Sequence, residues 1–150
     1  FKRRIKNIEN KKERITRNIL FFLKPKVTVE YVVENYSLRQ AMEKMEIHRY
    51  SSIPIISKAG EYIGTLSEGD ILWYFKKLGK FNLQASENIN IMEIERHRDN
   101  APIKVDAQIQ DLINVSKSQN FVPVIDDRNM FIGIVTRQDI ISYFYDISSK

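Results

Sequence analysis

The sequence repeats itself, and this duplication constrains the fold more than any other feature of the chain. A shift of 69 residues superposes residues 53–75 on residues 122–144, and eight of the twenty-three aligned positions are identical without a gap. Chance would give about one or two identities for ordinary composition. Most other positions exchange similar residues, such as Ser67 with Thr136. The duplication indicates two copies of one structural unit, and it has to be recognised before any other pattern is interpreted.

Each copy contains a helical pattern followed by two strand patterns. Apolar residues recur at the spacing of an amphipathic helix at Leu38, Ala41, Met42 and Met45, and again at Ile109, Leu112 and Ile113. Ser37 and Gln40 predict a capping box at the start of the first of these helices. We expect strands at residues 53–57, 62–66, 122–126 and 131–135, and further helices at about residues 69–78 and 138–147. Each half therefore predicts the order β-α-β-β-α, an α+β fold in which each half covers the apolar sheet face of the other.

The two copies also divide the chain. We predict a first repeat at residues 21–79, a polar connector at residues 80–90 and a second repeat at residues 91–150, preceded by a basic arm or helix at residues 1–20. Residues 1–17 contain eight Lys or Arg against two Glu, a charge of +6, so the rest of the chain is close to neutral. The basic character therefore belongs to the arm, and the body has no evident surface for a phosphate backbone.

The sequence lacks the residues that most catalytic and metal sites need. There is no cysteine, and the two histidines, His48 and His97, do not have metal-ligand spacing. No nucleophile elbow, phosphate-binding loop or dinucleotide fingerprint is present. We therefore expect no enzyme, no catalytic residue, no metal and no catalytic cofactor. No apolar run approaches the roughly 20 residues that cross a bilayer, so we expect a cytoplasmic protein without a membrane segment.

The runs IPIISKAGEYIGTLSEGDIL and VPVIDDRNMFIGIVTRQDII resemble the CBS domain. The resemblance extends over about residues 21–147, and it is specific because the motif occurs twice with the same internal spacing. It implies tandem CBS domains, a Bateman module, in which the two repeats pack around a pseudo-twofold axis. It also implies that adenosine-containing ligands bind in the clefts between the repeats.

The motif places a hydroxyl and an acid at the start of the last helix of each repeat. In the second repeat, the candidate nucleotide-binding residues are Thr136, Arg137 and Asp139. A helix N-terminus suits phosphate oxygens, arginine adds a charged contact, and in CBS proteins the matching Asp accepts the ribose hydroxyls. In the first repeat, Ser67 and Asp70 match, but Glu68 replaces the arginine and repels phosphate. A simple helix cap is the alternative explanation at both places.

We refer to residues 24–31 and 96–103, which precede the first strand of each repeat, as the leading segments. Both are basic, and the resemblance implies that their backbone meets an adenine edge while arginine neutralises phosphate. The candidates are Thr28 and Tyr31 in the first segment and Arg98, Asn100, Ala101 and Ile103 in the second. A solvated basic loop is the alternative.

Residues around the repeated proline form a candidate wall against which a base would pack. They are Ser52, Ile53 and Pro54 in the first repeat, and Phe121, Val122 and Pro123 in the second. Core packing explains the apolar members equally well.

These patterns predict a non-catalytic regulatory module, a sensor of AMP, ADP or ATP that signals to a separate, unidentified effector protein. An alternative with the same fold is a cyclic di-AMP receptor, since two basic leading segments suit two phosphates. An alternative of a different class is nucleic-acid binding through the basic arm, which we do not expect because the arm lacks aromatic residues beyond Phe1.

Aromatic residues on the last helix of each repeat predict a homodimer interface, with core packing as the alternative. They are Trp73, Tyr74, Phe75, Tyr143, Phe144 and Tyr145.

Overall fold

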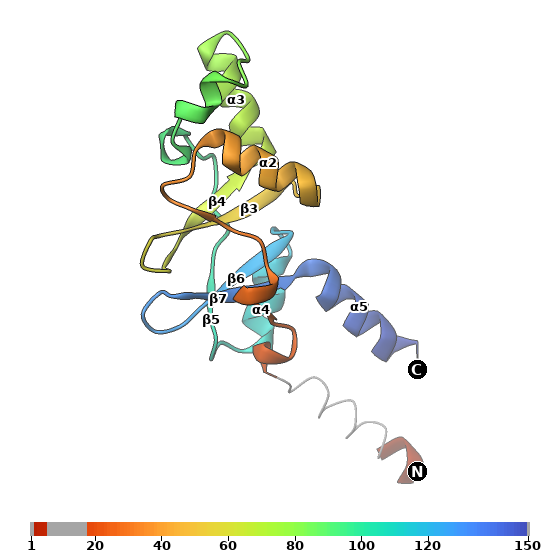
Figure 1. Cartoon of the computed structure of the whole chain (residues 1–150). Coiled ribbons are helices and arrows are strands. Elements are labelled where there is room, and N and C mark those ends of the chain that lie inside the picture. The colour runs from red at the N-terminus through yellow and green to blue at the C-terminus, as the bar shows by residue number, and fades with distance from the viewer. Residues whose placement is uncertain (1, 6–17, 150) are drawn as a thin grey trace.

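The computed structural model describes residues 2–5 and 18–149 and shows two halves with the same order of elements (Figure 1). The first half contains β2 (Val32–Val33), α2 (Leu38–His48), β3 (Ser52–Ile56), β4 (Tyr62–Ser67) and α3 (Glu68–Leu78). The second half contains β5 (Ile103–Lys104), α4 (Ile109–Ser116), β6 (Phe121–Ile125), β7 (Phe131–Thr136) and α5 (Arg137–Ser148). Short elements precede the first half, namely η1 (Ile19–Phe21), β1 (Lys24–Pro25) and η2 (Lys26–Thr28), and two more connect the halves, η3 (Ala85–Asn88) and η4 (Ile91–Glu93). The predicted β-α-β-β-α order is confirmed in both halves.

Local sequence signals set the ends of these elements. At the start of α2, Gln40 N–H donates to Ser37 Oγ at 3.2 Å, and Ser37 N–H donates to Gln40 Oε1 at 2.9 Å, so the predicted capping box is present. The strands β3 and β6 begin one residue earlier than predicted, because Ser52 and Phe121 already pair with the last residues of β4 and β7.

The strands form two sheets. The first half has the order β2-β3-β4, and the second half has the order β1-β7-β6-β5. In each half the first strand runs parallel to the second, which pairs antiparallel with the third. Both hairpins carry a register shift at the same place, between Ile55 and Ile56 and between Val124 and Ile125. The duplication seen in the sequence therefore extends to backbone detail.

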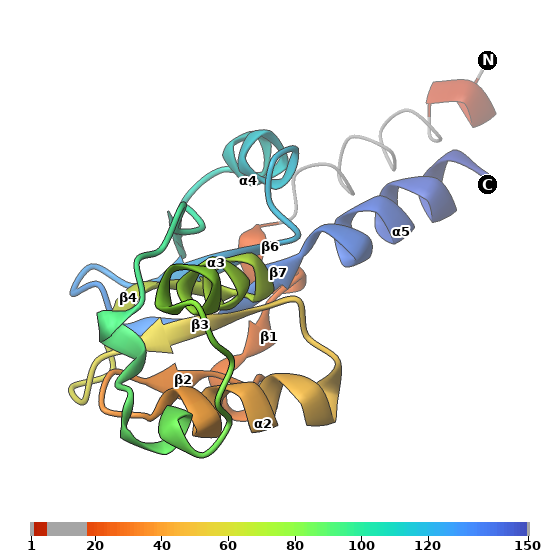
Figure 2. The ribbon, with the colours of Figure 1, turned by 90° about the horizontal axis from the view of Figure 1, so that it is seen from above.

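The two hairpin turns meet through a reciprocal pair of backbone hydrogen bonds. Tyr62 N–H donates to the Asn129 carbonyl at 3.1 Å, and Phe131 N–H donates to the Gly60 carbonyl at 2.9 Å. The 69-residue shift exchanges the partners of one bond with those of the other, so the halves are related by an approximate twofold axis. A buried apolar cluster lies at this junction, formed by Ile56, Tyr62, Phe121, Phe131 and Ile134. Beyond the junction, α5 extends away from the body (Figure 2).

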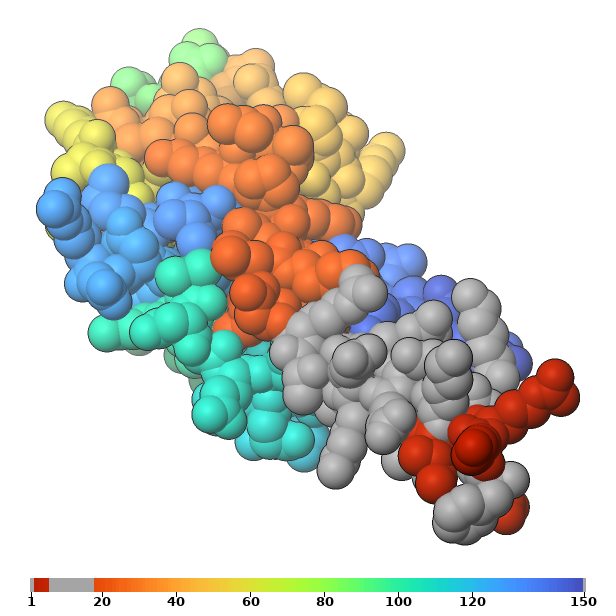
Figure 3. Space-filling view, turned by 90° about the horizontal axis from the view of Figure 1, so that it is seen from below, coloured from red at the N-terminus to blue at the C-terminus, as the bar shows by residue number. Residues whose placement is uncertain are grey.

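The chain that precedes the first half packs on the second half. Strand β1 pairs antiparallel with β7, with Lys24 opposite Ile134, and Phe22 is buried in the core of the second half. Gly133 permits this approach, because a Cβ there would lie 2.2 Å from the Lys24 carbonyl oxygen. The segment lies in orange between the two halves in Figure 3. Residues 19–25 thus supply an edge strand and core residues to the second half, although they precede the first half along the chain.

Most of the predicted basic arm lies outside the described residues. The structure describes residues 2–5 of it, which are helical, and residues 18–20, but not residue 1 or residues 6–17. Within the described parts of the chain, no helix has both the length and the apolar character that crossing a bilayer requires.

Candidate functional site

A cleft between the two halves contains residues from both repeats, and we call it the Thr136 cleft. It encloses about 330 Å³, a size typical of small-molecule sites. Its lining comes from the first leading segment, the approach to β3, and strands β6 and β7: Lys24, Thr28, Val29, Glu30, Arg49, Tyr50, Ser51, Ser52, Pro54, Asn120, Phe121, Ile134 and Thr136. Five of the predicted site residues therefore lie around one cavity, namely Thr28, Ser52, Pro54, Phe121 and Thr136.

The N-terminus of α5 opens at this cleft. Asp139 N–H donates to Thr136 Oγ1 at 3.2 Å, so the threonine caps the helix as the sequence indicates. The Asp139 carboxylate is 41% exposed, and its Oδ2 lies 3.4 Å from Lys24 Nζ. Arg137 is exposed beside them, and its backbone N–H donates to the Asn120 carbonyl at 3.0 Å. Phosphate-compatible groups and an accessible carboxylate thus lie at one end of the cavity.

One further polar contact in the cleft connects the two repeats, and the others lie within the first half and the segment that precedes it. Asn120 Nδ2 donates to Ser52 Oγ at 3.2 Å, which joins the strand β6 side to the strand β3 side. Thr28 Oγ1 donates to the Pro25 carbonyl at 2.9 Å. The Glu30 carboxylate pairs with Lys44 at 3.1 Å and lies 3.3 Å from His48 Nε2, so its charge is balanced from outside the cavity.

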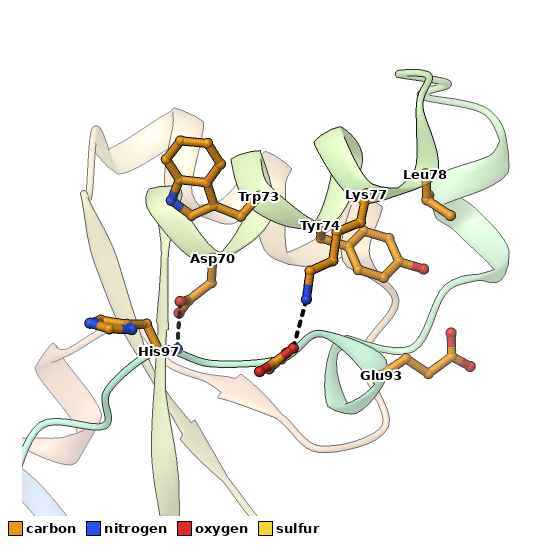
Figure 4. Close-up of a pocket in the computed structure, with 8 residues that line it drawn as sticks. Asp70, Trp73, Tyr74, Lys77, Leu78, Glu93 and His97 are labelled. Atoms are coloured by element: carbon orange, nitrogen blue, oxygen red, sulfur yellow. Dashed lines mark hydrogen bonds and ion pairs between the residues drawn. The ribbon is translucent and has the colours of Figure 1, made fainter.

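The first-repeat motif lies on the other side of the junction, and its acid is used internally. Asp70 is only 4% exposed. Its Oδ2 accepts the Ser67 N–H at 3.0 Å, and its Oδ1 accepts the His97 N–H at 2.9 Å (Figure 4). Ser67 Oγ in turn accepts the Asp70 N–H at 3.1 Å. In this structure the predicted ribose-binding carboxylate of the first repeat therefore fixes the second leading segment to α3.

The second leading segment lies against β4 through side-chain contacts, whereas β1 pairs with β7 as a strand. Thr65 N–H donates to Asp99 Oδ1 at 2.9 Å, and Arg96 Nε donates to the same oxygen at 2.8 Å. Tyr62 Oη donates to the Asn100 carbonyl at 2.7 Å and lies 2.8 Å from Thr65 Oγ1. Burial raises the pKa of the Tyr62 hydroxyl, the hydrogen bond with Thr65 lowers it, and the Asp99 charge raises it further.

Gln119 fills the region next to this segment. It is 4% exposed, and its carboxamide is bonded to both backbone groups of Ala101. Arg98 extends outward and donates to Ser118 Oγ at 3.1 Å. The region around Asp70, Asp99 and Gln119 is the counterpart of the Thr136 cleft under the approximate twofold axis, and we call it the Gln119 cleft although Gln119 fills it.

The structure thus separates the predicted site residues into three groups. Thr28, Ser52, Pro54, Phe121 and Thr136 line the Thr136 cleft, and Arg137 and Asp139 follow Thr136 in α5, where Asp139 contacts the lining residue Lys24. Ser67, Asp70, Arg98, Asn100 and Ala101 lie at the Gln119 cleft. Ile53, Val122, Pro123 and Ile103 are buried core residues, and Tyr31 packs against the apolar cluster at the junction. Each leading segment therefore faces the acidic motif of the other repeat.

Three important residues were not among the predicted sites, namely Lys24, Asp99 and Gln119. Lys24 and Asp99 lie at the edges of β7 and β4, and their role depends on which strand each leading segment covers. Gln119 had one signal in the sequence, because the 69-residue shift aligns it with Tyr50, so the repeat exchanges an aromatic side chain for an amide.

A larger hollow, of about 380 Å³, lies beside α3 in the first half (Figure 4). Its lining is Asp70, Trp73, Tyr74, Lys77, Leu78, Glu93, Glu95 and His97. Lys77 Nζ donates to Glu95 Oε2 at 2.9 Å, and this hydrogen bond lowers the pKa of Glu95. Although this hollow is larger, its lining comes from α3 and from residues 93–97, and the acid near its helix N-terminus, Asp70, is buried. The Thr136 cleft is therefore the better candidate site.

Potential metal ligands are dispersed. In the part of the chain that the structure describes, no three His, Asp or Glu side chains are grouped in a way that would hold a metal ion.

Comparison with known proteins adds family information to this geometry. The family model for the CBS domain matches residues 18–77 and 91–146. A structure of CbpB in complex with c-di-AMP has a TM-score of 0.84 at 24% identity, covering 96% of this chain and 95% of that one. CbpB from Streptococcus agalactiae has a TM-score of 0.73 at 26% identity, covering 88% and 85% of the two chains. CbpB from Listeria monocytogenes in complex with c-di-AMP has a TM-score of 0.75 at 20% identity, covering 85% and 95%.

One curated relative has an enzymatic name. The L-aspartate semialdehyde sulfurtransferase of Methanocaldococcus jannaschii is 29% identical over 121 residues, which is 81% of this chain. The chain spans only 22% of the length of that relative. The sulfurtransferase activity in its name is therefore not assigned to this chain.

Proposed function

This chain belongs to the CBS domain family, and from that premise we propose that it is a non-catalytic regulatory module that binds an adenine nucleotide in the Thr136 cleft. The observation that carries the proposal is the opening of the α5 N-terminus, with its accessible acid, into a cavity shared by both repeats. Proteins with CBS domains of this kind are regulatory. We propose that such a module responds to the concentration of the nucleotide inside the cell.

The groups around the cleft match the parts of a nucleotide. The Asp139 carboxylate accepts both ribose hydroxyls, and Lys24, its present partner, turns to the phosphate. The α5 N-terminus and the Arg137 guanidinium supply further phosphate contacts. The base packs against Pro54 and Phe121, which line the cavity.

Binding at this place acts on the relation between the repeats. Lys24 belongs to β1, which pairs with the second half, and the chain continues from β1 through η2 into the first half. A ligand that replaces the contact between Lys24 and Asp139 changes the position of the segment from β1 to η2 relative to the second half. The change is effective only to the extent that the nucleotide binds one arrangement more tightly than the other. The output passes to a separate effector protein.

Cyclic di-AMP is the second candidate ligand. Solved CBS-domain structures with this fold contain c-di-AMP, and Lys24 and Arg49 place two cations in the lining of the cleft. Two phosphates in one ligand suit two cations.

Nucleic-acid binding through residues 1–17 has no support from the described body. A DNA titration of a variant without these residues tests it, because only an arm-dependent, salt-sensitive affinity would support it.

We further propose a homodimer through the last helices of the repeats. Phe75 is a core residue, and Tyr74, Tyr143 and Phe144 pack partly against the cores. Other large apolar side chains on these helices are exposed: Leu72, Trp73, Ile141 and Tyr145. Light scattering of the wild type and of Ile141→Glu tests this, and a monomeric wild type would refute it.

A ligand panel tests the function. The melting temperature of the wild type and of Asp139→Ala is measured with AMP, ATP and c-di-AMP. A nucleotide that raises the melting temperature of the wild type, with a much smaller effect on the variant, supports the proposal and selects the ligand. An absent shift with all three nucleotides contradicts it.

A further inference from the structure

The two clefts are equivalent in backbone register but differ in what fills them. Ser52 pairs with Ser67 as Phe121 pairs with Thr136, so Tyr50 and Gln119 occupy equivalent positions, two residues before these strand starts. Val32 pairs with Ile55 as Ile103 pairs with Val124. Counting back two residues from Val32 and from Ile103 makes Glu30 and Ala101 equivalent positions of the two leading segments.

In the Gln119 cleft, a side chain is bonded to the backbone of the leading segment. The Ala101 N–H donates to Gln119 Oε1 at 2.7 Å, and Gln119 Nε2 donates to the Ala101 carbonyl at 3.1 Å. Nε2 also donates to the Phe121 carbonyl at 3.2 Å. The carboxamide thus presents an acceptor and a donor side by side to one residue. An adenine edge presents the same pair, a ring nitrogen beside the 6-amino group.

In the Thr136 cleft, the equivalent positions are arranged differently. The Tyr50 ring stacks on His48, with ring centroids 5.3 Å apart, and lines the cavity of about 330 Å³ rather than filling it. Neither backbone group of Glu30 is hydrogen-bonded to any residue that the structure describes. The groups that Gln119 occupies in one cleft are therefore available in the other.

We infer that Gln119 is a built-in occupant of the base position in the Gln119 cleft, so that the chain binds one adenine nucleotide rather than two. This inference rests on the proposed function of the Thr136 cleft. The other polar groups of the Gln119 cleft fit the same state, because Asp70 and Asp99 both bind backbone N–H groups of the protein. Gln119 determines how many nucleotide sites are open, and Asp139 binds the ribose at the open site, the Thr136 cleft.

Calorimetry with AMP on the full chain tests the inference. The wild type is expected to bind one AMP per chain, and Gln119→Ala two. The second site should be retained in Gln119→Ala/Asp139→Ala, where only the Gln119 cleft remains. It should bind purine riboside monophosphate, which lacks the 6-amino group, at least tenfold more weakly than AMP. Gln110→Ala is the matched control, because the Gln110 side chain bonds to Asn114 within α4 and to no other residue in the described part of the chain, and it should keep one site.

The outcomes separate this inference from the proposed function. One site in both the wild type and Gln119→Ala, or two in the wild type, overturns the role of Gln119 and leaves the Thr136 cleft in place. No site in the wild type and one in Gln119→Ala refutes the Thr136 cleft but supports Gln119. No site in either protein overturns both.

Amide hydrogen exchange gives a second measurement that needs no variant. In the ligand-free wild type, the Ala101 amide is expected to exchange at least tenfold more slowly than the Glu30 amide. Addition of AMP should slow exchange at Glu30 and leave Ala101 unchanged. An unprotected Ala101 amide, or one that AMP protects further, would contradict the inference.

Discussion

Lys24 Nζ lies 3.4 Å from Asp139 Oδ2, although the lysine precedes the first repeat and the aspartate opens the last helix of the second. The contact joins the two ends of the described body at the Thr136 cleft. It also explains why the two repeated aspartates differ, since Asp70 binds backbone N–H groups and is buried. One acid is therefore accessible to a ligand, and the other holds the structure together.

Replacing Asp139 by alanine should weaken nucleotide binding, whereas replacing Asp70 by alanine should lower stability. Asp139→Ala should weaken nucleotide affinity about 10- to 100-fold, because hydrogen bonds to a charged group contribute about 1.5–3 kcal/mol, with little change in stability. Asp70→Ala should lower the free energy of unfolding by about 1–3 kcal/mol, because it removes the acceptor of two backbone N–H groups, and should leave affinity within about twofold. Calorimetry and urea unfolding measure the two effects. Equal or reversed affinity losses would refute the assignment.

Two helix caps provide a matched pair of variants. Ser37→Ala and Thr136→Ala each remove an N-cap, so both should lower the free energy of unfolding by about 1 kcal/mol. Only Thr136 lines the cleft, so only Thr136→Ala should also lower nucleotide affinity, and Thr136→Ser should retain both properties. A similar affinity loss in Ser37→Ala would show that helix stability, rather than contact with the ligand, controls binding.

The close approach of Asp99 to Gly64 predicts a coupled pair. A Cβ at Gly64 would lie 2.3 Å from Asp99 Oδ1, so Gly64→Ala should lower the free energy of unfolding by about 2 kcal/mol or more. In an Asp99→Ala background the same change should cost at least about 1 kcal/mol less, since contacting residues are energetically coupled. Gly69→Ala is the control, because its nearest contact is 3.7 Å away and alanine favours a helix. Additive losses in the double variant would contradict the contact.

Tyr62 predicts a loss of stability at high pH. Burial raises the pKa of its hydroxyl in the folded chain, while the unfolded chain titrates near the ordinary tyrosine pKa of about 10. The stabilising contribution is therefore complete below pH of about 10 and is lost as the pH rises toward the folded pKa, because the unfolded state releases its proton first. Urea unfolding between pH 8 and pH 11 should show a steeper decline for the wild type than for Tyr62→Phe. Parallel curves would show that another group causes the decline.

The sequence was sufficient for the fold because the fold is encoded by local and repeated signals. Helix periodicity at Leu38 to Met45, the cap at Ser37 and the duplicated strand-turn-strand runs each describe neighbouring residues, and all were found at the predicted positions or within one residue of them. Strand ends were displaced by one residue, because a strand ends where its ladder partner ends. The candidate residues Thr136 and Asp139 also followed from the sequence, as the hydroxyl and acid that open a helix.

By itself, then, the sequence determined the repeat, its order of elements and the residues that open each final helix. Only the tertiary structure decided which pieces meet, because a leading segment can cover the edge of either sheet with the same local sequence. It placed the first segment on β7 and the second on β4, so that Lys24 reached Asp139 and Asp99 reached Thr65. It also brought the Gln119 carboxamide into hydrogen bonds with the backbone of Ala101. These contacts depend on how two sheets pack around an axis, and no local pattern contains that information.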